Sequence, residues 1–180
     1  LELNGRGTVI ACRDAAALAA CAAVLALDHG AAVQNLTWSW LTAAQDGTPA
    51  MAGKAEATAY LPPQSRRWEP RLGGLAGGSS LPGLSVAGTD ALPVQQFVLL
   101  EQAPEDEEAR CEPIAASGAL SALRKDHWAT PQLALPPHPG YADILESALG
   151  QAACMQAVFA GAALRPLCRA LVKELATAGD

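Results

Sequence analysis

Basic charge is scarce in this chain. It holds 12 lysine and arginine residues against 18 aspartate and glutamate residues, which gives a formal net charge of −6. A protein that binds the phosphate backbone of DNA or RNA needs an excess of basic side chains on its surface. The composition therefore argues against a nucleic-acid partner. Most of the acidic excess lies in residues 101–112, which we interpret as a solvent-exposed acidic loop.

Long apolar runs are also missing. A membrane-spanning helix needs about 18 or more consecutive apolar residues. Residues 15–27 are apolar but too few, and Asp14 and Asp28 bracket them. The start of the sequence shows neither the basic stretch nor the cleavage site of a signal peptide. We therefore expect no membrane span in this segment.

Metal-binding and disulfide patterns are missing as well. The five cysteines form no C-x-x-C pair, and the three histidines form no pair at i, i+4. No metal cofactor is therefore expected. The odd number of cysteines and their largely apolar surroundings favour reduced thiols in the core, and hence a cytoplasmic location. The cysteines are Cys12, Cys21, Cys111, Cys154 and Cys168.

What the chain does contain is enough apolar material for one core. Hydrophobic residues make up 51% of its 180 residues, so we expect residues 1–180 to form a single domain. Alanine supplies much of this fraction, and a few large side chains are the expected anchors. These are Trp38, Trp40, Trp68, Trp128, Phe97 and Phe159.

The first thirty residues predict a strand followed by a helix. Residues 8–11 are short, apolar and partly β-branched, and residues 15–28 favour helix throughout. Asp14 stands where its carboxylate can accept the free N–H groups of the first helical turn. Gly30 stands where a left-handed residue can end the helix.

A β-hairpin is predicted next. Residues 32–41 alternate as a strand, residues 45–48 (Gln-Asp-Gly-Thr) form the turn, and residues 52–61 are the returning strand. Trp38 and Trp40 lie on the same face of the first strand. Such a pair either fills the core or presents itself to another chain, and both readings stay open.

Residues 62–92 are rich in proline and glycine and predict an irregular excursion across the domain surface. The glycines at 73–78 invite comparison with a phosphate-binding loop. No lysine follows them and no strand-to-helix context surrounds them, so we interpret this stretch as a flexible loop.

The second half predicts strands and helices in alternation. Residues 93–101 read as a central strand and residues 153–160 as a second one. Helices are predicted at 115–125, 141–150 and 164–175, the last with one buried face. Leu164, Leu167, Cys168, Leu171 and Leu175 form that face. The alternation predicts an α/β fold, a layered sheet with flanking helices.

The order of these pieces resembles the HPr kinase/phosphorylase-like family of P-loop proteins. The similar elements are a Pro-Val entry into a strand ending in Leu100-Glu101, a polar loop, the stretch Glu112-Pro113-Ile114, and a helix that ends near Asp126-His127-Trp128. A further helix, a strand and a closing helix follow. The resemblance extends over most of the chain and implies a P-loop-like fold, with ATP and Mg²⁺ as cofactors of an active member.

The defining motif of that family is missing. G-x-x-x-x-G-K-[ST] supplies backbone amides and a lysine for the phosphates and a hydroxyl for Mg²⁺. The corresponding residues 11–17 read Ala-Cys-Arg-Asp-Ala-Ala-Ala, without glycine or lysine. Asp14 puts a negative charge at the helix start, where phosphate would bind. The family's paired acidic residues would fall near Asn35-Leu36-Thr37, where no carboxylate stands.

Three residues at this position remain candidate contacts for an anion or a nucleotide: Cys12, Arg13 and Asp14. Arg13 either replaces the missing lysine as an anion contact or pairs with a carboxylate. Cys12 lies where a helix dipole lowers a thiol pKa, but the adjacent Asp14 opposes that effect, so a buried neutral thiol is expected. No catalytic residue is assigned.

Three functions follow as hypotheses. The first is a non-catalytic, degenerate kinase-like domain that needs no cofactor and acts by binding a peptide or protein partner. The second is an active ATP-dependent kinase or phosphotransferase with an atypical phosphate site. The third is a ferredoxin-like structural module of a secretion or pilus assembly, suggested by the strand–helix–strand–hairpin order of residues 1–61.

Overall fold

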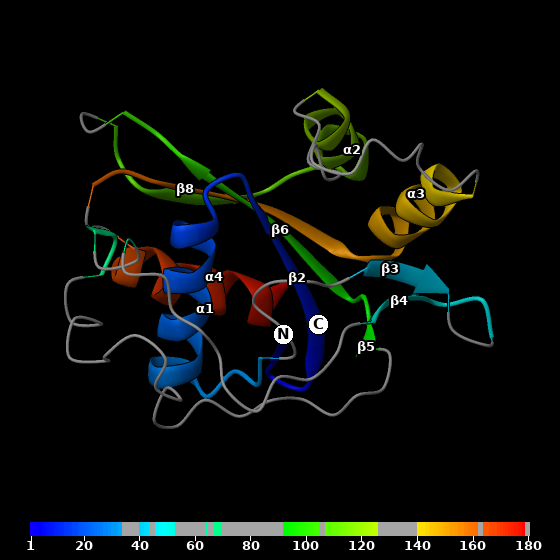
Figure 1. The fold of residues 1–180 in the computed structure, drawn as a ribbon, viewed down its shortest axis with the longest axis horizontal. Helices are drawn as coiled ribbons and strands as arrows, with labels where there is room; N and C mark the ends of the chain where they lie inside the picture. Colours follow the sequence, from blue (N-terminus) through cyan, green and yellow to red (C-terminus); the bar gives the residue numbers. More distant parts are fainter. Residues whose placement is uncertain are drawn as a thin grey trace.

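The computed structural model describes residues 1–33, 40–43, 46–52, 64, 67–69, 92–104, 107–125, 140–161 and 164–178. Its centre is a five-stranded sheet with the order β1-β2-β6-β8-β7 (Figure 1). The three inner strands are parallel: β2 (Arg6–Cys12), β6 (Gln96–Gln102) and β8 (Ala153–Phe159). The two edge strands, β1 (Glu2–Leu3) and β7 (Arg110–Pro113), pair antiparallel with their neighbours.

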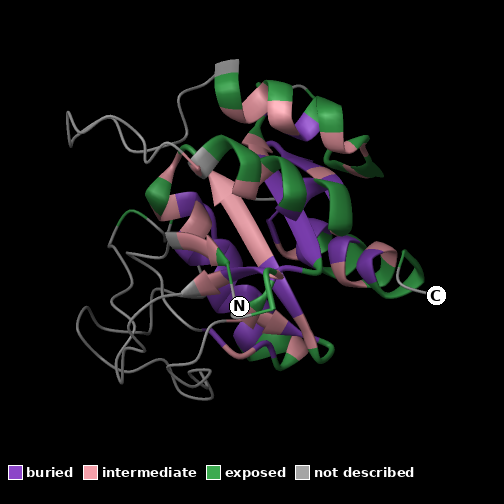
Figure 2. Cartoon of the chain, turned by 90° about the vertical axis from the view of Figure 1, so that its right-hand side faces the viewer, coloured by how far each residue is buried: buried purple, intermediate pink, exposed green. Residues whose placement is uncertain are grey.

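Helices cover both faces of this sheet. On one face, α1 (Ala15–His29) and α4 (Leu164–Thr177) share a core cluster with the sheet, anchored by Phe159. On the other face, α2 (Ala116–Lys125) and α3 (Tyr141–Gln151) pack over Phe97 and Leu99. The buried residues gather in the sheet and in α1, whereas α2 and α3 are largely exposed or half-buried (Figure 2). The predicted α/β class, a layered sheet with flanking helices, is confirmed.

Burial on both faces explains the composition of β6. Its first five residues, Gln96 to Leu100, are all buried. A parallel strand between two helical layers needs apolar side chains on both of its sides, so it reads as a continuous apolar run. The predicted central position of this strand is confirmed, because β6 is the third of the five strands.

The first helix has the caps that its sequence predicts. Asp14 is the N-cap, and Gly30 ends the helix in the left-handed conformation at φ 69°. The helix is buried on all of its sides over two turns, because every residue from Ala19 to Ala26 is buried. By contrast, α4 buries the five predicted residues and no others.

A separate three-stranded sheet has the order β3-β4-β5. It consists of β3 (Trp40–Ala43), β4 (Pro49–Ala52) and β5 (Leu92–Pro93). The predicted hairpin is confirmed: β3 and β4 pair antiparallel, and Gly47 takes φ 82° in the turn between them. The helix α3 packs against β3 and β4.

Two predicted strand boundaries were wrong. The returning strand begins at Pro49 and not at residue 52, because pairing starts directly after the turn; β4 is described as far as Ala52, and residues 53–61 lie outside the described residues. The strand predicted at 32–41 contributes an isolated bridge between Ala32 and Glu2, and then β3 from Trp40 onward. Residues 34–39, with Trp38, lie outside the described part of the chain.

Most of the predicted excursion at 62–92 also lies outside the described residues. The short described piece of it is not confined to the surface. Trp68 is 3% exposed and meets the ring of Phe159 edge-on, with 5.1 Å between the ring centroids. Trp68 is therefore a core anchor for α1 and α4, as its size suggests.

Within the described residues, the helices are too short or too polar for any of them to traverse a bilayer.

Candidate functional site

The carboxyl ends of the parallel strands mark the edge of the sheet where α/β proteins bind ligands. The strands β2, β6 and β8 run in the same direction, so Cys12, Gln102 and Phe159 end at this common edge (Figure 1). All three sequence-predicted contacts lie here, in the connection from β2 to α1.

That connection consists of only two residues, Arg13 and Asp14, because β2 ends at Cys12 and α1 begins at Ala15. The Oδ1 atom of Asp14 accepts hydrogen bonds from the backbone N–H groups of Ala16, at 2.8 Å, and Ala17, at 3.0 Å. A phosphate at a helix N-terminus would use N–H groups of this first turn. An internal carboxylate therefore already occupies the position that a phosphate oxygen would take.

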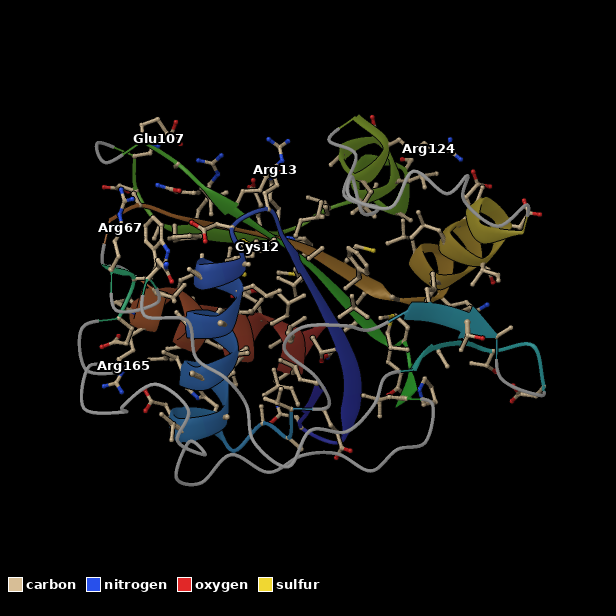
Figure 3. The ribbon with its side chains drawn as sticks, viewed as in Figure 1. Cys12, Arg13, Arg67, Glu107, Arg124 and Arg165 are labelled. Carbon is tan, nitrogen blue, oxygen red and sulfur yellow. The ribbon has the colours of Figure 1, made fainter. Side chains whose placement is uncertain are left out.

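Arg13 is exposed and its side chain is directed away from α1, to the side of the sheet that carries α2 (Figure 3). It does not reach over the amino end of α1, as a lysine of a phosphate loop would. The geometry places Arg13 and the capped helix end on different sides of the same turn.

Cys12 is half-buried beside this turn. Loss of hydration, together with the smaller effect of the carboxylates of Asp14 and Glu101, raises the pKa of its thiol to about 11, against a hydrogen bond with the Asp14 backbone that lowers it. A thiol with this pKa is protonated at neutral pH and is a poor nucleophile. The expectation of a neutral thiol agrees with this environment.

A polar set that the sequence did not predict as a group lies on the neighbouring strands. The Nε2 atom of Gln156 in β8 donates to Oε2 of Glu101 in β6, at 2.7 Å. On β7, Arg110 lies 3.2 Å from Glu107 and 3.6 Å from Glu112. The acidic run signals part of this set, and Glu107, Glu108 and Glu112 are exposed as expected. Glu101 differs, since it is half-buried in a strand; nothing in the sequence signals Gln156.

A second polar cluster lies on the face of the sheet that α1 and α4 cover. The Nε and Nη2 atoms of Arg165 in α4 lie 2.9 Å and 3.1 Å from the carboxylate of Asp28 in α1. Glu69, whose side chain is only 6% exposed, lies 3.6 Å from the same Nε. Figure 3 shows Arg165 beside the lower turns of α1. This cluster, which we call the Arg165 clasp, joins α1, α4 and the segment that contains Glu69, and we assign it a structural role.

The sheet edges differ in how they are protected against pairing with another chain. Short edges, charged side chains and prolines discourage such pairing. The edge strands β1 and β5 have two residues each, and β7 carries Arg110, Glu112 and Pro113. The edge strand β3, Trp-Leu-Thr-Ala, has neither charge nor proline, and among the described residues β4 is its one strand neighbour.

No group of three or more histidine, cysteine, aspartate or glutamate side chains stands close enough to hold a metal ion within the described ranges. Comparison of the chain with protein-family models, with curated proteins and with solved structures finds no match.

Proposed function

We propose that this chain is a non-catalytic, degenerate kinase-like α/β domain of the HPr kinase/phosphorylase-like type, and that it acts by binding a peptide or protein partner. The resemblance in the order of strands and helices supports the proposed relationship to P-loop proteins. The parallel arrangement of β2, β6 and β8 is compatible with it.

The observation that carries the proposal is the capped amino end of α1. Asp14 accepts two of the backbone hydrogen bonds that a bound phosphate would otherwise receive. Its negative charge also opposes an incoming anion at the positive end of the helix dipole. A two-residue connection leaves no loop to wrap a triphosphate, so nucleotide chemistry at this turn is disfavoured.

The strand β3 is the best-supported place for a partner. It begins with Trp40, one of the two tryptophans proposed for partner binding, and among the edge strands that the structure describes it is the one without charge or proline. A partner that adds an extended segment to such an edge gains backbone hydrogen bonds along the strand. Trp38 lies outside the described residues and stays a sequence-based candidate.

The nucleotide question is tested by titrating the chain with ATP and Mg²⁺ in a calorimeter. We expect no saturable binding, because the amides at the helix start are occupied by Asp14. The variants Arg13→Ala and Asp14→Asn serve as comparisons. Saturable binding by the unmodified chain that disappears in Arg13→Ala would support the active-kinase alternative and contradict the proposal.

The partner question is tested at β3 with Ala43→Lys, which places a charge on the exposed last residue of the strand. Proteins that co-purify with the chain from its native host are identified by mass spectrometry, and the direct complex is then measured with the purified partner. We expect Ala43→Lys to weaken this complex at least about tenfold, because a lysine on an edge strand hinders strand addition.

The matched control is Ala170→Lys, which adds the same charge to an exposed alanine of α4. It is expected to leave the affinity unchanged. Equal affinities of the two lysine variants would exclude β3 as the binding edge.

A further inference from the structure

Two thiols from different helices meet in the core. The Sγ atoms of Cys21 in α1 and Cys168 in α4 lie 3.6 Å apart, although 147 positions separate the residues in sequence. Their side chains are 1% and 0% exposed. Each sulfur therefore has the other as its polar neighbour in an otherwise apolar cluster.

Small side chains allow the two helices to approach closely at this point. Ala17 and Ala20 of α1 belong to the same buried cluster as Leu167 and Leu171 of α4. Helices that present alanines at their contact can bring their axes close together, which lets two short side chains touch. The thiols thus meet at a direct contact of two packed helices, not across a loop.

We propose that Cys21 and Cys168 form a site of disulfide formation that ties α1 to α4. A small-molecule disulfide is the oxidant. The Cys21 thiolate attacks one sulfur of this reagent and releases one free thiol, and the Cys168 thiolate then attacks the mixed disulfide and releases the second. The reagent's S–S bond is replaced by one between the two cysteines; two electrons pass to the reagent, and the two protons end on the released thiols.

The packing of α1 against α4 hinders both the formation and the reduction of this disulfide. The hydrogen bond with Cys168 and burial raise the pKa of the Cys21 thiol well above its ordinary value, so the thiolate is rare in the folded protein. The reagent also has no access to a buried sulfur. We therefore expect the bond to form while the chain folds or while α1 and α4 are apart, and to be protected from reductants once the helices have closed around it.

A disulfide between Cys21 and Cys168 would stabilise the folded state. It closes a loop between residues that are 147 positions apart, which restricts the unfolded chain strongly. The stability of the domain would then depend on the redox conditions under which it folded. This inference does not depend on the proposed partner-binding function.

The test is to refold the chain from urea with a mixture of oxidised and reduced glutathione, and in parallel with excess dithiothreitol. Free thiols are then alkylated and the cross-linked peptides mapped by mass spectrometry. We expect a Cys21–Cys168 peptide lighter by two hydrogen atoms, and a higher urea midpoint for the oxidised form. The folded protein, given the same mixture, is expected to oxidise at least about ten times more slowly than the refolding chain.

Cys21→Ala and Cys168→Ala should each abolish the cross-link and the shift in midpoint. The matched control Cys111→Ala removes a half-buried thiol from β7 and should retain both. Alkylation of Cys21 and Cys168 after oxidative refolding would overturn the proposal. A cross-link that joins other cysteines, or an oxidised form with a lower urea midpoint, would overturn it as well.

Discussion

At the scale of single residues, Arg165 shows how one cation can link segments that are far apart in the sequence. Its guanidinium lies between Asp28 of α1 and Glu69, a side chain that is almost fully buried. Ion pairs of this kind stabilise chiefly because breaking them leaves a buried charge behind.

We expect Arg165→Ala to lower the free energy of unfolding by about 2 kcal/mol. Breaking a fully buried pair costs about 3–5 kcal/mol, and the partial exposure of Arg165 and Asp28 reduces that value. Urea denaturation measures the effect. Arg165→Lys keeps the charge and should cost less, whereas Arg169→Ala, on the exposed side of α4, should change the free energy of unfolding by no more than about 0.5 kcal/mol. Equal effects at positions 165 and 169 would refute the clasp.

At the scale of elements, Gly7 marks the place where the two sheets meet. It lies in β2, and a Cβ atom there would overlap the carbonyl oxygen of Pro93 in β5. That backbone cannot easily withdraw, because Gln95 donates its N–H to the Gly7 carbonyl and Val94 donates its N–H to Pro49. The close approach of the backbones therefore requires glycine at this position.

Gly7→Ala is accordingly expected to destabilise the domain by about 3 kcal/mol, because overpacking against fixed backbone has no low-energy relief. Thermal and urea unfolding provide the measurement. Gly118→Ala is the matched control: nothing lies within 4 Å of its Cβ position in α2, and the substitution should stabilise by up to about 1 kcal/mol. A tolerated alanine at position 7 would show that the junction is looser than described.

Local sequence signals predicted most of the helices and strands, but they did not predict the contacts between these elements. The caps Asp14 and Gly30 act within one or two turns of their own helix, so the residues alone predict them. The buried face of α4 follows from its period of 3.6 residues. The edge strand β7 was not predicted, because its four residues include two charges and a proline, which mimic a loop.

The breadth of burial around α1 was not predictable from periodicity. A helix of alanines has no contrast between its faces, so a sequence pattern cannot tell which sides are covered. The clasp at Arg165 and the contact between Cys21 and Cys168 join segments far apart in the chain. Their partners depend on the packing of the whole domain, which no local pattern encodes.

At the scale of the whole molecule, two cysteines make the free energy of unfolding fall at alkaline pH. Burial raises the pKa of Cys12 and of Cys111 from 9.0 to about 11. The folded state therefore holds these protons more tightly than the unfolded state does. The stabilisation is complete below the unfolded pKa of 9.0 and is lost as the pH rises to about 11.

We expect the stabilisation from these two half-buried thiols to be constant below about pH 9 and then to fall by about 2 kcal/mol, which urea midpoints measured across the alkaline range report. The double variant Cys12→Ala/Cys111→Ala is the comparison, since lysine and tyrosine titrate in the same range in both proteins. The difference between the two curves isolates the thiols. Parallel curves would mean that neither thiol contributes.

The strand order has a consequence for how the chain is made on the ribosome. β7 follows β6 closely in sequence, yet β8 lies between them in the finished sheet. While residues beyond β7 are still being synthesised, β6 and β7 can join as a hairpin that the native protein does not contain. Such a premature hairpin has to open before β8 can insert, so we expect a slow, late step in folding and a nascent chain that benefits from a chaperone.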